Sequence, residues 1–202
     1  MEVVEHRLAR ACHSHSRQPS RGRLLFQRSR GAARLAERHR ARRGGQLAAA
    51  VWTLREATSA DYNGFYHLDQ QCFPPGIAYS RADFRAFLSQ PHSIALLAEG
   101  ATGALLGFIL AGQRRRGELH YGYVVTIDVA ESARRQGVGR ALLFAVEKHL
   151  REEGLASIRL EVAVDNLAAQ QFYEREQYRP IGRIPRYYMD KIDALVLEKS
   201  LL

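Results

Sequence analysis

The segment RRQGVGR, from Arg134 to Arg140, combines two glycines with three arginines and is suited to holding a phosphate group. Gly137 and Gly139 lack side chains, so the backbone there can approach a ligand closely. If a helix begins at this point, its first N–H groups have no intrahelical partner and lie at the positive end of the helix dipole. The arginines add full charges around the same turn. This pattern predicts the binding of an anion, and a pyrophosphate fits it.

Other interpretations of this turn can be weighed on its residues. The glycines could simply make a tight turn, with the arginines solvated on the surface. A P-loop is excluded because Lys and then Ser or Thr should follow the glycines, and the chain has Arg140 and Ala141 instead. A dinucleotide-binding fingerprint requires a third glycine three residues after Gly139, where the chain has Leu142.

The flanking elements would place the turn between a strand and a helix. Residues 121–129, YGYVVTIDV, are rich in β-branched and aromatic residues, which is typical of a buried strand. Residues 138–154 predict a helix that ends at Gly154. Its apolar face carries residues at four-residue intervals, namely Val138, Leu142, Val146 and Leu150.

The remaining patterns complete an α/β domain over residues 51–202. Strands are expected at residues 51–57, 93–99, 104–113, 117–129, 157–164, 178–188 and 193–201. Helices are expected at residues 60–73, after Thr58 or Ser59 as cap, at 80–90 with Ser80 as cap, at 138–153 and at 167–176. In residues 157–164 the apolar side chains Ile158, Leu160, Val162 and Val164 alternate with Arg159, Glu161 and Ala163. The order predicts a mixed α/β sheet with helices on both faces.

Several of these motifs, in this order, resemble the GNAT family of N-acetyltransferases. Arg134-x-x-Gly137-x-Gly139, between a strand and a helix, looks like the acetyl-CoA-binding signature of that family. Residues 162–178, VAVDNLAAQQFYEREQY, resemble its second helical motif. Residues 186–201 resemble the closing hairpin of the branch that acetylates ribosomal-protein alanine and other protein N-termini. The resemblance implies a GNAT-like, mostly antiparallel central sheet.

The resemblance also implies acetyl-CoA as a co-substrate and assigns residues to it. The signature contributes Arg134, Arg135, Gln136, Gly137, Val138, Gly139 and Arg140. The preceding strand would bind the pantetheine arm and hold the acetyl carbonyl through the backbone of Ile127, Asp128 and Val129. By resemblance Asn166 contacts CoA, and by its position it could cap the helix beginning near Leu167, for which Asp165 is a rival. No metal is expected.

Acetyl transfer to an amine requires a base for the amine and a proton for the departing thiolate. By resemblance, Glu161 is the catalytic base, although it could instead be a strand carboxylate paired with Arg159 or Arg183. By resemblance, Tyr173 is the acid that faces the CoA sulfur, and the alternative is an ordinary half-buried aromatic beside Phe172. We expect direct transfer in a ternary complex, without an acyl-enzyme, because Cys12 and Cys72 lie outside the signature segments.

The acceptor site is expected between two aromatic segments. Phe73, Pro74 and Tyr79 on one side, and Tyr187 and Tyr188 on the other, resemble the walls of a peptide-binding groove, although they could equally be packing aromatics. Because no large acidic cluster is present, a small or neutral N-terminal peptide, including that of a ribosomal protein, fits better than a polyamine. A small-molecule amine remains an alternative.

Two segments differ from the family pattern. The family usually has glycine where this chain has Gln177, at a position that ends a helix in the left-handed conformation. Keeping that geometry should cost on the order of 1 kcal/mol. The wall segment PPGIAYS also differs from the Pro-Trp-Ser that is usual in the branch.

Residues 1–50 carry the whole positive balance of the chain. They contain twelve of the 30 basic residues, all arginine, and three of the 21 acids, whereas residues 51–202 contain eighteen of each. Their composition predicts a largely disordered tail. It could bind RNA or the ribosome, with the domain serving as a CoA sensor, or it could be a transit peptide. It could also be untranslated sequence before a true start at Val51.

Two cysteines do not suggest a disulfide framework, and no apolar run reaches the roughly 18 residues of a membrane helix. We therefore expect a soluble cytoplasmic protein that does not bind membranes.

Overall fold

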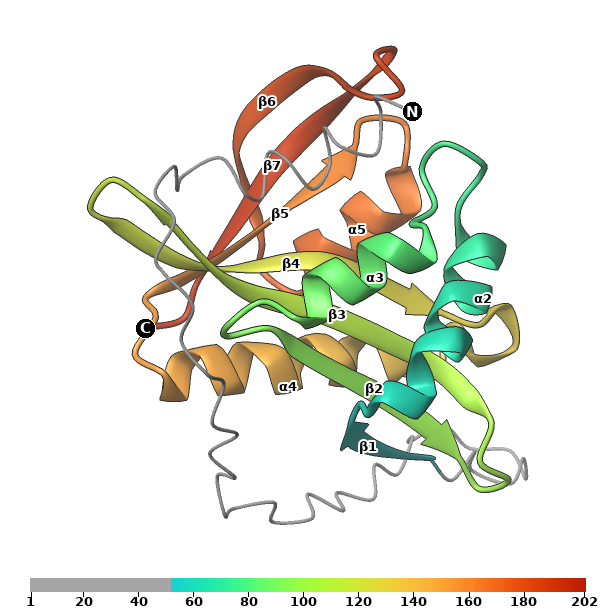
Figure 1. Cartoon of the computed structure of the whole chain (residues 1–202). Coiled ribbons are helices and arrows are strands. Elements are labelled where there is room, and N and C mark those ends of the chain that lie inside the picture. The colour runs from blue at the N-terminus through green and yellow to red at the C-terminus, as the bar shows by residue number, and fades with distance from the viewer. Residues whose placement is uncertain (1–51) are drawn as a thin grey trace, which may run out of the picture.

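Seven strands form one sheet in the residues that the structure, a computed structural model, describes, namely 52–202 (Figure 1). They are β1 (Trp52–Glu56), β2 (Ile94–Gly100), β3 (Leu105–Arg116), β4 (Leu119–Val129), β5 (Ser157–Ala163), β6 (Arg179–Tyr188) and β7 (Ile192–Ser200). Their order is β1-β2-β3-β4-β5-β7-β6, and every neighbouring pair is antiparallel except β4 and β5. The expected mixed, mostly antiparallel sheet is confirmed. The predictions for residues 1–50 lie outside the described residues.

The helices begin and end close to the positions that the sequence predicts. They are η1 (Ser59–Asp61), α2 (Tyr62–Cys72), α3 (Arg81–Leu88), η2 (Glu131–Ala133), α4 (Val138–Glu152) and α5 (Leu167–Arg175). Thr58 precedes η1 in a capping box, and Ser80 caps α3 in a second one with Asp83. None of the helices in residues 52–202 is long and apolar enough to cross a membrane.

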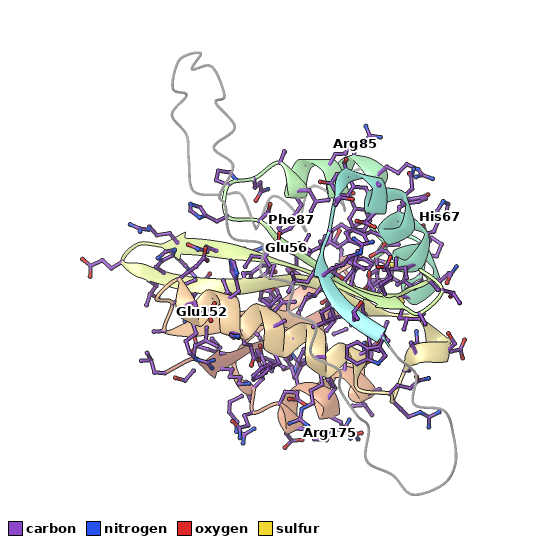
Figure 2. All side chains as sticks on the ribbon, turned by 90° about the horizontal axis from the view of Figure 1, so that it is seen from below. Glu56, His67, Arg85, Phe87, Glu152 and Arg175 are labelled. Atoms are coloured by element: carbon purple, nitrogen blue, oxygen red, sulfur yellow. The ribbon has the colours of Figure 1, made fainter. Side chains whose placement is uncertain are left out.

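The helices cover both faces of the sheet. Figure 2 shows α2 and α3 on one side and α4 and α5 on the other, with Phe87 between α3 and the sheet and Arg85 on the outer side of α3. The α2 and α3 side is packed mainly with aromatic rings, among them Phe65, Phe84, Phe87 and Phe108. The α4 side buries the apolar stripe of the predicted helix together with Ile158, Leu160 and Val162. Glu161 therefore points toward the opposite side, that of α2 and α3.

The pairing between β4 and β5 stops after two residue pairs. Gly122 pairs with Ile158 and Tyr123 with Arg159, whereas β4 continues to Val129 along β3 and β5 continues to Ala163 along β7. A β-bulge at Val125, opposite Leu110 and Ala111, lies where the two strands separate. We call the region between residues 124–129 of β4 and 160–163 of β5 the split. Backbone groups of both strands that face the split are not used for pairing between them.

A buried carboxylate connects α4 to two other elements. Glu147 on α4 is 3% exposed, and its carboxylate accepts hydrogen bonds from the Tyr178 hydroxyl at 2.9 Å and from Lys199 Nζ at 2.6 Å. Tyr178 follows α5 and Lys199 lies on β7. The helical pattern of the sequence gives no signal for this network. Removing one member of such a buried pair typically costs about 3–5 kcal/mol.

The end of α5 has the left-handed geometry that the family pattern implies. Gln177 has φ of 70°, its N–H donates to the Glu174 carbonyl at 3.0 Å, and the Tyr178 N–H donates to the Tyr173 carbonyl at 2.9 Å. These two bonds form a Schellman motif, in which glycine is the usual residue at the left-handed position. The left-handed geometry that is predicted to cost stability at Gln177 is therefore present.

We expect Gln177→Gly to raise the free energy of unfolding by about 1 kcal/mol, because glycine adopts positive φ without a Cβ clash. Denaturant unfolding monitored by circular dichroism measures the change. The control is Gln171→Gly, at an exposed position inside α5, which should lower stability by about 1 kcal/mol. Equal destabilisation by the two variants would contradict strain at Gln177.

Candidate active site

The glycine-arginine turn has a backbone suited to an anion. Gly137, immediately before α4, has φ of 87° and is exposed, and Arg135 has φ of 60°. A positive φ at a residue other than glycine is uncommon and is often found at functional sites. The first N–H groups of α4 follow directly, so the positive end of a 15-residue helix lies at this turn.

Side chains of the turn tie it to β4 and α5. The Arg134 Nε donates to the Val129 carbonyl at 3.2 Å, and Arg140 forms an ion pair of 3.3 Å with Glu176 at the end of α5. The Gln136 amide donates to the Ser132 carbonyl at 2.6 Å. Within residues 52–202, Arg135 forms no ion pair.

The structure brings the turn against the end of β4. A Cβ added to Gly139 would be 3.5 Å from Val129, 3.8 Å from Phe172 and 3.9 Å from Ile127, which are ordinary contacts. Val138 is fully buried beneath the turn, and Asp128 is buried, with its carboxylate accepting a hydrogen bond from the Thr126 hydroxyl at 3.0 Å. The residues assigned to acetyl-CoA on β4 and on the turn are therefore contiguous in space.

Asn166 is the cap of α5. Its side-chain oxygen accepts the Ala169 N–H at 3.1 Å, whereas Asp165, the rival, does not occupy the cap position. Asn166 is exposed, at the end of the loop that leaves β5. Its contact with CoA stays a prediction.

Glu161 is half-buried on the α2 and α3 side of β5, beside the split. The Tyr123 hydroxyl donates a hydrogen bond to its carboxylate. The two arginines considered as its partners pair elsewhere, Arg159 with Glu198 at 2.5 Å and Arg183 with Asp193 at 2.7 Å. Both arginines therefore pair with carboxylates other than the one considered from the sequence.

Tyr123 is a candidate site residue that the sequence did not point to. It is buried on β4, and the Arg114 guanidinium carbon lies 3.1 Å from its ring centroid. Burial and the nearby Glu161 charge raise the pKa of Tyr123 well above its ordinary value, so its hydroxyl remains a donor. The sequence identifies Tyr123 only as a strand aromatic, because its contact with Glu161 depends on the register between β4 and β5.

Tyr173 belongs to the core on the α4 side, opposite the side that Glu161 faces. It is 6% exposed, and its ring centroid lies 5.1 Å from that of Phe172 and 5.6 Å from that of Tyr178. Burial, with smaller contributions from Tyr188 and Asp128, raises the pKa of Tyr173 above its ordinary value. Its phenol therefore stays protonated at neutral pH and can serve as a proton donor.

The two aromatic walls lie close together. The loop of Phe73, Pro74 and Gly76 approaches the β6–β7 hairpin, since a Cβ on Gly76 would be 3.4 Å from the Met189 sulfur. Met189 follows Tyr188 and was not among the predicted wall residues. The two segments predicted to form the acceptor site are therefore distant in the sequence but close in space.

The individual wall residues differ in burial. Phe73 and Tyr187 are half-buried and Pro74 is exposed. Tyr188 is 7% exposed, and its hydroxyl donates to the Glu161 carbonyl at 3.2 Å. Tyr79 is 5% exposed and packs against Phe84 at 5.8 Å, so the packing alternative accounts for its position.

Cys72 lies outside the signature in the sequence but next to it in space. Its thiol is 3.7 Å from the Val129 carbonyl and 4.0 Å from Arg134 Nη2. Burial, followed by the Asp128 charge, raises the pKa of Cys72. A protonated thiol is a weak nucleophile, which is consistent with the expectation of direct transfer.

Comparisons with known proteins indicate the family that the sequence resembles. The model of the acetyltransferase (GNAT) family matches residues 62–177. An uncharacterized N-acetyltransferase of Methanocaldococcus jannaschii is 28% identical over 148 residues, covering 73% of this chain and 90% of the relative. N-alpha-acetyltransferase 30 of Schizosaccharomyces pombe is 30% identical over 116 residues, covering 57% of this chain and 77% of the relative.

Solved structures have the same fold. Ard1 from Thermoplasma volcanium superposes with a TM-score of 0.67 at 29% identity, covering 75% of this chain and 98% of that chain. Arabidopsis thaliana NAA60 in complex with acetyl-CoA has a TM-score of 0.64 at 21% identity, covering 74% and 98%. The latter likeness concerns the fold alone. Sequence and fold together place the chain in the acetyltransferase (GNAT) family, and it is an N-acetyltransferase.

Proposed function

We propose that this enzyme transfers the acetyl group of acetyl-CoA directly to the α-amine of a protein N-terminus. The observation that carries the proposal is that Glu161 lies on the α2 and α3 side of β5, beside the split, whereas Tyr173 lies in the core on the α4 side, close enough to Asp128 of β4 for that charge to contribute to its raised pKa. With the base on one side of the sheet and the acid on the other, the amine can approach from one side while the thiol leaves toward the other.

The described residues fit acetyl-CoA. The left-handed Gly137 and the start of α4 provide N–H groups for the pyrophosphate, with Arg135 and Arg140 beside them. Ile127, Asp128 and Val129 would hold the pantetheine arm along the split. When bound, acetyl-CoA supplies a thioester carbonyl that an amine can attack.

The roles of the protein's own residues follow from their protonation. Glu161 accepts the proton of the attacking amine, and the hydrogen bond from Tyr123 orients its carboxylate. Tyr173 donates its proton to the departing sulfur. An α-amine has a pKa near 8 and a lysine side chain near 10.4, so an N-terminus demands less of a carboxylate base.

Two observations favour a peptide over a small amine as the acceptor. The aromatic loop after α2 and the β6–β7 hairpin meet beside Glu161, where Tyr188 contacts its backbone. Relatives such as that of Schizosaccharomyces pombe are named N-alpha-acetyltransferases. The resemblance to the ribosomal-protein branch makes a ribosomal protein one candidate acceptor, and the cytoplasm is the compartment that we propose.

Gly137→Ala should raise the KM for acetyl-CoA by about tenfold or more, because a Cβ opposes the left-handed backbone that aims the helix N–H groups. Steady-state kinetics with varied acetyl-CoA measures this effect. Gly103→Ala is the matched control, since Gly103 also has positive φ, at 81°, and nothing within 4 Å, but it lies in the β2–β3 turn. An unchanged KM for Gly137→Ala would contradict the proposed phosphate site.

Glu161→Gln and Tyr173→Phe should each lower kcat about 10²–10⁴-fold, the usual contribution of a general acid or base. Because the pKa of Tyr173 is raised above its ordinary value, Tyr173 should stay protonated up to at least about pH 10. The wild-type kcat should therefore not fall through loss of this acid below that pH. Glu174→Gln, an exposed carboxylate on α5, is the control. Full activity of either active-site variant at neutral pH would remove its assigned role.

A panel of N-terminal peptides and small amines, read by CoA release, tests the acceptor class. We expect peptides to be acetylated at the α-amine. Their kcat/KM should be at least about tenfold above that of polyamines and aminoglycosides, because only a peptide contacts both aromatic walls. Mass spectrometry locates the acetyl group. Turnover confined to small amines would contradict protein N-terminal acetylation.

A further inference from the structure

A polar hollow lies next to Tyr123 on the α2 and α3 side of the sheet. The segment between α3 and β2 forms one wall, and β3 and β4 form the other. Its lining includes Gln90, His92, Ser93, Arg114, Tyr123 and Val125. None of the residues that line it is acidic. The mechanism proposed above does not use this hollow, although it shares Tyr123 with it.

Arg114 carries the charge of the hollow. It is half-buried on β3, and its guanidinium carbon lies 3.1 Å from the Tyr123 ring centroid. Within residues 52–202 it forms no ion pair. A guanidinium in contact with a ring face still presents N–H donors along its edge, in the fork geometry that matches a carboxylate. The hollow therefore has a positioned cation and no acid of its own.

The hollow is one aromatic side chain away from the proposed base. The Tyr123 ring contacts Arg114 on its face and donates to Glu161 through its hydroxyl. An extended peptide advances about 3.3 Å per residue, so one or two residues cover about the length of a tyrosine side chain. With the α-amine at Glu161, the side chain of the first or second acceptor residue would reach Arg114.

We propose that this hollow is an acceptor subsite for an acidic side chain, Asp or Glu, within the first two residues of the acceptor peptide. The inference rests on the proposed function and names its substrate class. It refines the expectation of a neutral peptide, which came from the lack of a large acidic cluster in residues 51–202. The total charge of those residues is zero, but the lining of this hollow is locally positive.

The test compares kcat/KM for peptides that differ only in an Asp, Asn or Lys at the second residue, with Glu and Gln peptides as a second series. For the wild-type enzyme we expect Asp over Asn by about tenfold, as charge-assisted hydrogen bonds typically provide. Arg114→Gln should bring this ratio close to one, and Arg114→Glu should favour the Lys peptide. Because the readout is a ratio, any effect on catalysis that is common to both peptides cancels.

The matched control is Arg116→Gln, an exposed arginine on the same strand outside the hollow, which should leave the ratio unchanged. Thermal unfolding and the KM for acetyl-CoA verify that the variants fold. The subsite would be overturned if the wild-type enzyme acetylated peptides with no higher kcat/KM for the acidic ones, or if Arg114→Gln lowered kcat/KM equally for all peptides. Either result would leave the proposed N-terminal acetylation intact. Absence of any peptide acetylation would overturn the proposed function itself.

Discussion

The early end of pairing between β4 and β5 is the constraint on which the rest of the site depends. Parallel strands normally share a ladder along their length, and here the ladder covers two residue pairs. Each strand keeps its other neighbour, β3 or β7, so the sheet stays whole while it opens in the middle. This opening lets one strand carry the backbone that we propose binds the cofactor, while the next carries Glu161, the proposed base.

The opening also separates two chemical environments. On one side Glu161 is half-buried and accepts a hydrogen bond from Tyr123, and on the other Tyr173 is enclosed in the core with its pKa raised by burial. In the roles that we propose, the carboxylate has to accept a proton and the phenol has to keep one, and these roles require different surroundings. The alternation of β5 and the docking of α5 supply these surroundings.

Local patterns in the sequence were sufficient to predict the helices and strands and the turn at Gly137. The helix caps at Ser80 and Asn166 and the alternation of Ile158, Leu160 and Val162 all depend on neighbours in the chain. The missed contacts depend on register. Tyr123 meets Glu161, and Arg114 meets Tyr123, only because three strands align in one way. Cys72 likewise reaches Val129 through tertiary packing.

Glu147 has a consequence for how this sequence can change. Its carboxylate accepts hydrogen bonds from the hydroxyl of Tyr178, which follows α5, and from the ammonium of Lys199 on β7, while its own helix begins at the Gly137 turn. Replacing Glu147 alone would leave Lys199 as a poorly compensated charge, whereas replacing all three with apolar residues could be tolerated. In related chains these three positions should therefore vary together.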